Sequence, residues 1–373
     1  MYTLEDIRPP AGLSVPIVSV LDEAGHLIEE DQRAVVRYVV QNGAGADVVF
    51  AAGTTGEWDQ ISNVLRQRVI QICVEEVAKL NAQLSPGTGS RPVEAWAGIT
   101  ARGTRETLAN LDLALAIGAD AAVLAPLSIR ELRDPVPFLM RDVADLLDAR
   151  PRRIPIYLYD NADIAADPRV PHIRTRQVKA LSRLDFVRGI KVSAPRRVLG
   201  HYTKAAANFR ERGEFAIYVG DAMLIFDLLR PRRGFFGALA AYWNRYRLHG
   251  TLPRGVVAGP ANVLPREWAR AWQVCCVGDE ERMRDVRVVL EAFRLGTHLA
   301  SGKRSIACLK RALRTLGVIQ SDAVAEGTPH LTRPDAERFD ESFEKVRALA
   351  RERIGVPWVT PEIADVRVKQ AVL

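Results

Sequence analysis

The chain has 373 residues, of which 48% are hydrophobic and 26% are charged, and this composition is typical of a globular protein. Its formal net charge of +7 comes from 52 basic residues spread along the chain among 45 acidic residues, a distribution that argues against nucleic acid as a partner. No apolar run approaches the roughly 20 residues that span a bilayer, and the N-terminal segment, acidic and then proline-rich, lacks the pattern of a signal peptide.

Short apolar runs rich in β-branched residues alternate with longer stretches of helical period over most of the chain. The runs expected to form strands are Leu13–Val20, Asp47–Ala52, Val93–Ile99, Ala121–Ala125, Ile154–Tyr159, Phe186–Val192, Phe215–Val219 and Gly255–Ala258. The stretches expected to be helical are Asp31–Asn42, Asn63–Leu80, Arg105–Ile117, Pro135–Asp148, Arg174–Ser182, Arg196–Arg210, a stretch after Ala222, one helix each within Arg266–Leu299 and Lys303–Leu316, and Asp335–Arg353.

Eight strands, each separated from the next by a helix, predict a (β/α)₈ barrel, also called a TIM barrel. Several of the runs are apolar throughout, which is typical of strands covered on both faces. A doubly wound open sheet is the alternative, but no strand is followed by the G-x-G-x-x-G pattern. Because the residues after about 260 are helical, we expect the barrel over 1–260, and the last barrel helix with a C-terminal helical subdomain over 261–373.

In such a barrel the functional residues lie at the carboxyl ends of the strands. The second strand is followed by G-T-T-G-E, residues 53–57. Two glycines around two threonines at such a turn can present backbone N–H groups and hydroxyls to an anion. Glu57 stands ahead of the next helix, where the helix dipole favours a carboxylate. The same residues could also form a plain turn without a ligand, and both interpretations stay open.

The fifth, sixth and seventh strands end in further candidate residues. Tyr159 ends the fifth strand, where a phenol can transfer protons, whereas Tyr157 on the same face is expected to pack. Lys191 is the only lysine in an expected strand, and Gly189 on the same face leaves room for a substrate or a neighbouring side chain. Burial of an amine favours the neutral form that attacks a carbonyl. The alternative is a strand-end lysine that extends to water. The seventh strand ends at Gly220.

No motif for a metal or an activated nucleophile is present in the sequence. The six histidines are scattered without H-x-x-x-H spacing, and the G-x-S-x-G and Walker A patterns are absent. We therefore expect neither a metal nor a cofactor. The four cysteines show no C-x-x-C spacing, so we expect reduced thiols in a cytoplasmic protein.

The G-T-T-G-E segment, the tyrosine that ends strand five and the G-I-K segment at 189–191 occur in an order that resembles the dihydrodipicolinate synthase / N-acetylneuraminate lyase family of class I (Schiff-base) aldolases. The similarity runs from about residue 12 to about residue 320. It implies that Lys191 forms a Schiff base with a 2-oxo acid and that Tyr159 is the general acid/base. The substrate-binding residues that it implies are Gly53, Thr54, Thr55, Gly220 and Gly259, with the two threonines on the carboxylate.

The sequence also departs from the pattern of the dihydrodipicolinate synthases at several places, of which two bear on the second substrate. Those synthases have a tyrosine pair at the end of strand four, where this chain has the sequence A-P-L-S at 125–128. They also have an arginine five residues after the strand-five tyrosine, where this chain has Ile164. We therefore expect a sugar-acid or other 2-oxo-acid aldolase or dehydratase rather than a lysine-biosynthetic synthase, and an aromatic hydratase-aldolase stays open.

The expected function is thus that of a lyase acting on pyruvate or another 2-oxo acid, with an aldehyde as the second reactant. The alternative is an inactive family member that binds a 2-oxo acid as a sensor or scaffold. The family resemblance implies a homotetramer built as a dimer of dimers. A segment without counterpart at the family's usual length, Arg230–Pro253, contains a predicted amphipathic helix at Gly234–Leu248. This helix could pack on the barrel wall or lie over the catalytic face.

Overall fold

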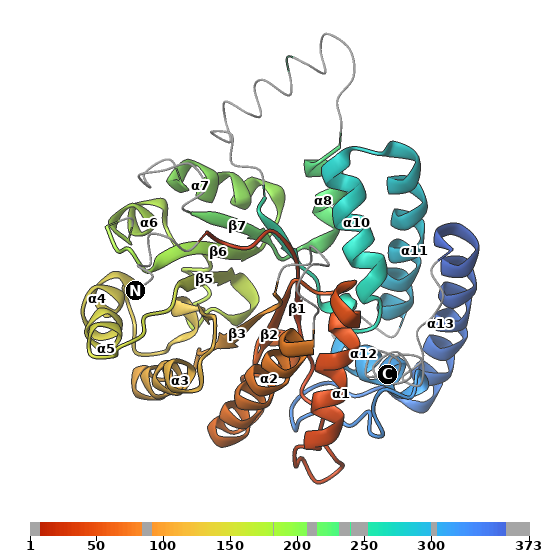
Figure 1. The fold of residues 1–373 in the computed structure, drawn as a ribbon, viewed down its shortest axis with the longest axis horizontal. Coiled ribbons are helices and arrows are strands. Elements are labelled where there is room, and N and C mark those ends of the chain that lie inside the picture. Colours follow the sequence, from red (N-terminus) through yellow and green to blue (C-terminus); the bar gives the residue numbers. More distant parts are fainter. Residues whose placement is uncertain are drawn as a thin grey trace. The chain divides into compact units, whose positions relative to one another are not determined.

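Eight parallel strands form a closed barrel in which they follow one another in chain order, from β1 to β8 (Figure 1). The structure is a computed structural model that describes residues 8–83, 92–181, 183–206, 215–230, 239, 253–299 and 304–355. The strands are β1 (Gly12–Pro16), β2 (Val48–Ala51), β3 (Glu94–Gly98), β4 (Ala121–Leu124), β5 (Ile156–Asn161), β6 (Val187–Ser193), β7 (Ala216–Val219) and β8 (Gly255–Val257). The predicted (β/α)₈ barrel is confirmed, and the open sheet is wrong.

Helices follow the strands along the chain, as the periodicity predicts. The α-helices that the structure describes before β8 are α1 (Glu29–Val40), α2 (Asn63–Gln83), α3 (Thr104–Ile117), α4 (Pro135–Phe138), α5 (Ala144–Asp148), α6 (Thr175–Leu181), α7 (Arg196–Ala206) and α8 (Ile225–Leu228). One turn of π-helix, Leu139–Val143, joins α4 to α5. None of the helices in the described ranges is long and apolar enough to cross a membrane.

The apolar strands are buried along their whole length. All four residues of β2 and all four of β4 are buried, as is expected where helices cover the outer face and side chains fill the barrel interior. Strands β5 and β6 pair in parallel over most of their length, and the pairing sets Tyr159 opposite Lys191. The register of this strand pair therefore decides which side chains meet at the carboxyl end of the sheet.

The described chain divides into two compact units, Met1–Gly12 with Glu94–Val257 and Leu13–Val93 with Ala258–Leu373. We call these unit 1 and unit 2. Unit 1 contains β3 to β8 with α3 to α8, and unit 2 contains β2, α1, α2 and the helices that follow β8. The expected division into a barrel over 1–260 and a helical part over 261–373 stays a prediction.

Among the described residues of unit 2, four α-helices follow β8, namely α10 (Pro265–Val277), α11 (Glu280–Leu299), α12 (Ser305–Thr315) and α13 (Arg333–Ile354). The single helix expected within Arg266–Leu299 is wrong, because Gly278 adopts a φ of 78° and ends α10 there. Such a left-handed residue is the usual helix stop, and glycine adopts it without steric cost.

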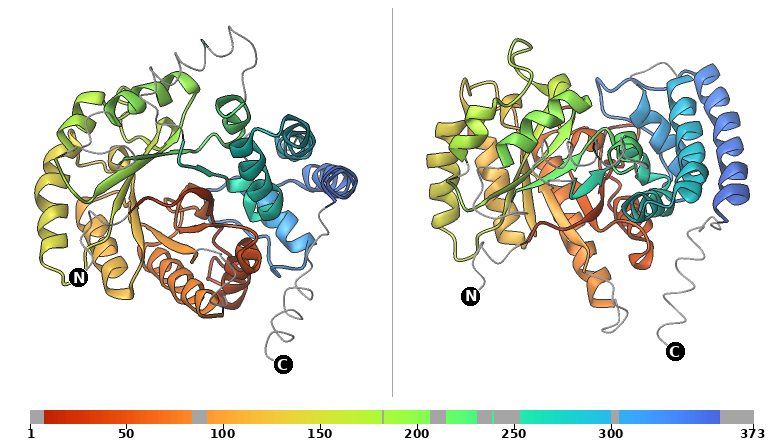
Figure 2. Two further views of the ribbon diagram at one scale, coloured as in Figure 1. Left: turned by 45° about the horizontal axis from the view of Figure 1, so that its top comes forward. Right: turned by 90° about the horizontal axis from the view of Figure 1, so that it is seen from above.

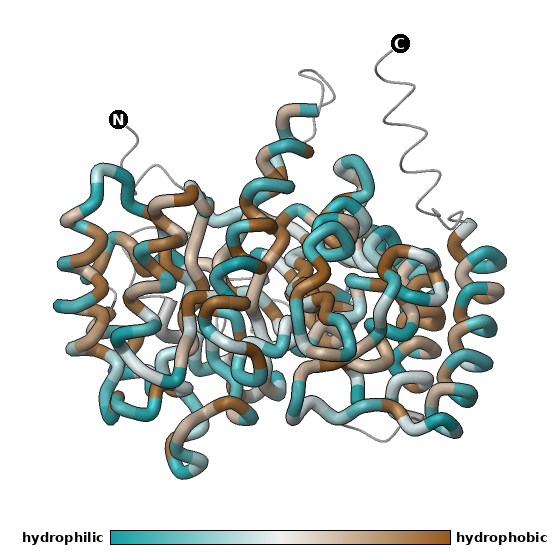
Figure 3. Tube along the Cα trace, turned by 90° about the horizontal axis from the view of Figure 1, so that it is seen from below, coloured by the Kyte–Doolittle hydropathy of each residue, from teal (hydrophilic) through white to brown (hydrophobic). Residues whose placement is uncertain are grey.

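Helices α11 and α13 lie side by side (Figures 1 and 2). Their contact includes Phe293, Phe339 and Phe343, whose ring centroids are 6.0–6.3 Å apart. Hydrophobic and hydrophilic bands alternate along α13 in Figure 3, and the buried apolar residues of this helix recur at helical spacing. The predicted amphipathic helix at Gly234–Leu248 lies outside the described residues, apart from Leu239, which is exposed.

Candidate active site

Lys191 and Tyr159 lie next to each other at the carboxyl ends of β6 and β5. The lysine Nζ lies 4.0 Å from the centroid of the Tyr159 ring. Lys191 is only 6% exposed and Tyr159 only 5%. The alternative of a lysine extended to water is therefore wrong. Lysine is rarely buried to this degree without a partner or a function, and the end of a barrel strand is where catalytic residues of this fold lie.

The Tyr159 hydroxyl belongs to a small polar cluster with two residues that were not among those predicted from the sequence. The Asn161 side-chain amide donates a hydrogen bond to this hydroxyl at 3.1 Å, and the Ser193 hydroxyl lies 3.4 Å from it. Strand alternation could have found both residues, because each lies two positions beyond Tyr159 or Lys191 on the same face. The cluster therefore gives the phenol two polar neighbours at the end of the strand pair.

Gly220 lies against this cluster at the end of β7. Its backbone N–H donates to the Val192 carbonyl at 2.7 Å. A Cβ at position 220 would lie 2.3 Å from the Ser193 Oγ, so a larger residue would displace the serine. The expected role of Gly220 in lining the substrate pocket stays a prediction, and what the structure shows is that it allows the β7 turn to approach Ser193.

The space next to Gly189 in the barrel interior is occupied by an aromatic cluster. A Cβ at Gly189 would lie 2.9 Å from the Tyr157 ring. Tyr157 is buried and stacks on Trp96 with ring centroids 4.2 Å apart, and Tyr218 meets both rings edge-on. Gly189 therefore leaves room for a neighbouring side chain, and the prediction that Tyr157 packs is confirmed.

Glu94 lies beside this aromatic cluster, and its carboxylate accepts a hydrogen bond from the Trp96 indole at 2.8 Å. Burial raises the pKa of Glu94 to about 7, although the Trp96 hydrogen bond opposes the shift. A carboxyl whose pKa is raised on folding binds its proton more tightly in the folded state. The folded chain therefore loses stability as the pH rises from the unfolded pKa, near 4.5, through about 7.

We expect Glu94→Gln to remove this loss, which amounts to about 3 kcal/mol for a shift of this size. Glutamine can still accept the Trp96 hydrogen bond but carries no charge. Denaturant unfolding at pH 5 and pH 8 measures the effect. The wild type should lose stability between the two values, with Glu267 also contributing because burial raises its pKa to about 7. An equal loss in the Glu94→Gln variant would show that Glu94 is not the titrating group.

The G-T-T-G-E segment forms a tight turn in unit 2. Residues Thr54–Gly56 make one turn of 3₁₀-helix after β2. Ala52 and Glu57 on either side both adopt left-handed φ values, 54° and 57°, which are uncommon for residues other than glycine. A Cβ at Gly259 would lie 3.2 Å from the Thr55 Oγ1. The structure thus brings together Thr55 and Gly259, two of the residues expected to bind substrate.

The carboxylate of Glu57 is buried in an ion pair, which corrects the expectation that it faces the start of the next helix. Glu57 is 1% exposed, and it accepts a hydrogen bond from the Lys310 Nζ at 2.5 Å. Its second oxygen accepts from the Ala325 backbone N–H at 2.7 Å. The partners lie more than 250 positions along the chain, so no local sequence pattern could have paired them.

Asp160, between Tyr159 and Asn161 on β5, is buried and bound on the other side of the strand. Its carboxylate accepts from the Ile173 backbone N–H at 2.9 Å and lies 2.8 Å from the His172 Nδ1. Burial raises the pKa of Asp160, although these hydrogen bonds oppose the shift. Asp160 therefore ties the segment after β5 back onto the strand that bears Tyr159.

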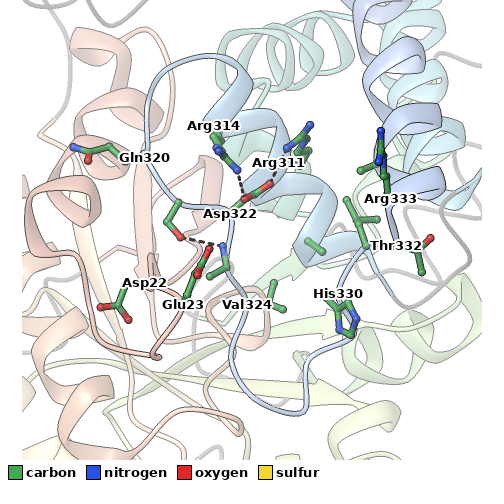
Figure 4. Close-up of a pocket in the computed structure, with 15 residues that line it drawn as sticks. Asp22, Glu23, Arg311, Arg314, Gln320, Asp322, Val324, His330, Thr332 and Arg333 are labelled. Carbon is green, nitrogen blue, oxygen red and sulfur yellow. Dashed lines mark hydrogen bonds and ion pairs between the residues drawn. The ribbon is translucent and has the colours of Figure 1, made fainter.

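Unit 2 also contains a cavity of about 490 Å³ between α12, the start of α13 and the loops at 22–23 and 320–324 (Figure 4). Arg311 and Arg314 of α12 both bind Asp322, which lines this cavity. None of the residues predicted to act on the substrate lines it. Within the described ranges, no group of three or more His, Cys, Asp or Glu side chains could hold a metal ion.

Part of this chain is similar to known proteins. Residues 9–112 match the dihydrodipicolinate synthetase family. The 4-hydroxy-tetrahydrodipicolinate synthase of Syntrophotalea carbinolica is 32% identical over 113 residues, which are 30% of this chain and 34% of the relative. The chain thus spans about a third of the length of such relatives. The synthase of Methanothermobacter thermautotrophicus is 29% identical over 324 residues, 84% of this chain and 94% of the relative.

Solved structures share the fold at low sequence identity. Dihydrodipicolinate synthase from Bacteroides thetaiotaomicron superposes with a TM-score of 0.70 at 20% identity, covering 91% of this chain and 99% of that one. The sialic acid aldolase of Ruminococcus gnavus gives 0.71 at 16% identity, covering 92% and 99%. These structures therefore share the (β/α)₈-barrel fold of this chain. The chain is thus similar to the dihydrodipicolinate synthase / N-acetylneuraminate lyase family, as its sequence motifs predict.

Proposed function

We propose that this chain is a class I lyase that forms a Schiff base between Lys191 and pyruvate or another 2-oxo acid. The observation that supports this most is the burial of Lys191 against Tyr159 at the ends of two paired strands. In its neutral form, an amine in such a place can attack a ketone. The polar groups at the Tyr159 hydroxyl, Asn161 and Ser193, suit the proton transfers that must follow.

The chemistry assigns one task to each group. The Lys191 nitrogen adds to the ketone carbon, and the resulting carbinolamine loses water to give a protonated imine. Tyr159 supplies the proton that leaves with this water. The imine then accepts the electron pair released when a C–C bond is cleaved or a C–H proton is removed, which gives an enamine. Thr54 and Thr55 bind the carboxylate of the 2-oxo acid through backbone N–H and hydroxyl groups, as the family resemblance implies.

We further propose that the second substrate is not that of the lysine-biosynthetic synthases. The chain has Leu127 and the buried Ser128 where those enzymes have a tyrosine pair, and Ile164 where they bind a carboxylate with arginine. A sugar-acid or other 2-oxo-acid aldolase or dehydratase suits these positions better. The aldehyde partner, the tetramer and the cytoplasmic location stay predictions.

Exchange of the pyruvate methyl protons in D₂O tests the proposal. Enamine formation removes one of these protons and reprotonation returns a deuteron, so the methyl signal in the proton NMR spectrum should decline with the wild type. Lys191→Ala is the control and should exchange no faster than buffer. If the wild type matched this control with pyruvate and with longer 2-oxo acids, the chain would be a binding protein and not a lyase.

We expect Thr55→Val to weaken binding of the 2-oxo acid without slowing the chemistry. Valine has the shape of threonine but lacks the hydroxyl, and a hydrogen bond to a charged group contributes about 1.5–3 kcal/mol. KM for the 2-oxo acid should rise by roughly one to two orders of magnitude, with kcat nearly unchanged. Thr315→Val, whose hydroxyl binds a carbonyl on the exposed end of α12, should have wild-type kinetics. An unchanged KM for Thr55→Val would remove this threonine from the carboxylate site.

A further inference from the structure

The turn that contains Thr54 and Thr55 is held at its end by a charge pair that water does not reach. Glu57 is 1% exposed and Lys310 is 0% exposed. The two oxygens of Glu57 are both engaged, one by the Lys310 ammonium at 2.5 Å and the other by the Ala325 backbone N–H at 2.7 Å. Every one of these contacts lies within unit 2.

Lys310 also fixes the chain segment that supplies the second of these contacts. Its Nζ donates a second hydrogen bond to the Ala323 carbonyl at 2.8 Å. The neighbouring Asp322 is bound by Arg311 at 3.3 Å and by Arg314 at 2.8 Å. Dashed lines mark both contacts in Figure 4. Helix α12 thus binds the segment 322–325, and this segment in turn binds the Glu57 carboxylate.

The turn has a conformation that needs such support. Glu57 adopts a φ of 57° and its backbone N–H donates to the Thr54 carbonyl at 3.1 Å. Residues other than glycine rarely adopt this φ, and they keep it only where the surrounding contacts require it. The directions of the Thr54 and Thr55 N–H groups depend on this backbone, so a change at Glu57 alters the donors that an anion would meet.

The chemistry of the pair also points to a role beyond holding α12 in place. Burying two charges costs desolvation free energy, and well-packed apolar side chains hold elements together as well or better. Burial lowers the pKa of Lys310, although attraction by Glu57 opposes this shift. Hydrogen bonds, unlike apolar contacts, set the direction of the Glu57 carboxylate and with it the end of the turn.

We propose that Lys310 is a positioning residue for the carboxylate of the 2-oxo acid. It acts through Glu57, which fixes the turn so that Thr54 and Thr55 direct their donors to the substrate, and it does not itself touch the substrate. The inference rests on the proposed function, because it assigns this turn to a substrate carboxylate.

The test uses a double variant, Glu57→Gln with Lys310→Met. Lys310→Met alone leaves Glu57 buried without a counter-charge and can fail to fold. The double variant removes both charges of this pair, the introduced glutamine can still accept from the Ala325 N–H, and methionine replaces the lysine stem. Arg304→Met is the matched control, because Arg304 lies just before α12 and pairs with Asp335, whereas Glu57 pairs with Lys310.

The readout is the concentration of pyruvate, and separately of methyl pyruvate, that gives half-maximal trapping by borohydride. For the double variant, we expect the pyruvate value to rise about tenfold or more, as for loss of hydrogen bonds to an anion, while the methyl pyruvate value stays near that of the wild type. Thermal unfolding should show a folded protein. Arg304→Met should keep both values.

Two outcomes would contradict the role of Lys310 and the proposed function separately. A folded double variant with the wild-type ratio of the pyruvate and methyl pyruvate values would show that Lys310 only stabilises the fold. If the wild type formed no adduct with either compound, the proposed function would fail, and the inference with it.

Discussion

Lys191→Ala is expected to abolish turnover while the protein stays folded. The substitution removes the amine that forms the imine, so the rate should fall by at least about 10⁶-fold, the lower range of enzymatic rate enhancement. Lys191→Arg should be equally inactive, because a guanidinium group stays protonated and cannot attack a carbonyl. Steady-state kinetics with a 2-oxo acid substrate, together with thermal unfolding of each variant, measures both expectations.

Lys191→Met is the matched control for packing. Lys191 is 6% exposed, so alanine leaves a cavity in the barrel, whereas methionine fills most of the same volume without an amine. Loss of activity in all three variants, with unfolding of Lys191→Met close to that of the wild type, would assign the loss to the amine. Appreciable turnover by any of them would contradict the mechanism.

Tyr159→Phe is expected to lower kcat by about 10²–10⁴-fold, which is the usual contribution of a general acid/base. The ring stays beside Lys191, and only the hydroxyl bound by Asn161 is lost. KM for the 2-oxo acid should change little, because the carboxylate is assigned to Thr54 and Thr55. This split between kcat and KM separates proton transfer from binding.

Ser193→Ala serves as the control for the Tyr159 prediction. It removes a neighbour of the phenol at 3.4 Å but leaves the phenol itself, so we expect a smaller loss of kcat than with Tyr159→Phe. If Tyr159→Phe kept the wild-type kcat, the proton transfer would have to be reassigned, with Ser193 as the next group to test.

The barrel could be predicted from sequence because its signal is local. Runs such as those of β2 and β4 are apolar throughout, since parallel strands are buried on both faces, and each helix has its own period. The candidate lysine and tyrosine followed from the same rule, because strand ends are where this fold places its chemistry. The division of 266–299 into two helices could also have been predicted, because Gly278 is the residue type that ends a helix.

The contacts that fix the site could not be predicted, because they join distant positions. In the sequence, Lys310 cannot be told from a surface lysine on an amphipathic helix. Only in the folded chain does it meet Glu57. The same holds for Asp160, whose burial against the segment near Ile173 depends on the conformation of the loop after β5. Side chains that pair across such separations leave no periodic pattern in the sequence.

Reduction with borohydride in the presence of pyruvate, followed by intact mass and peptide mapping, tests the central claim most directly. Borohydride reduces the imine to a stable secondary amine, so we expect one adduct of reduced pyruvate per chain, located at Lys191 and absent from Lys191→Ala. An adduct on another lysine, or no adduct with pyruvate or any longer 2-oxo acid, would contradict the claim that Lys191 forms a Schiff base.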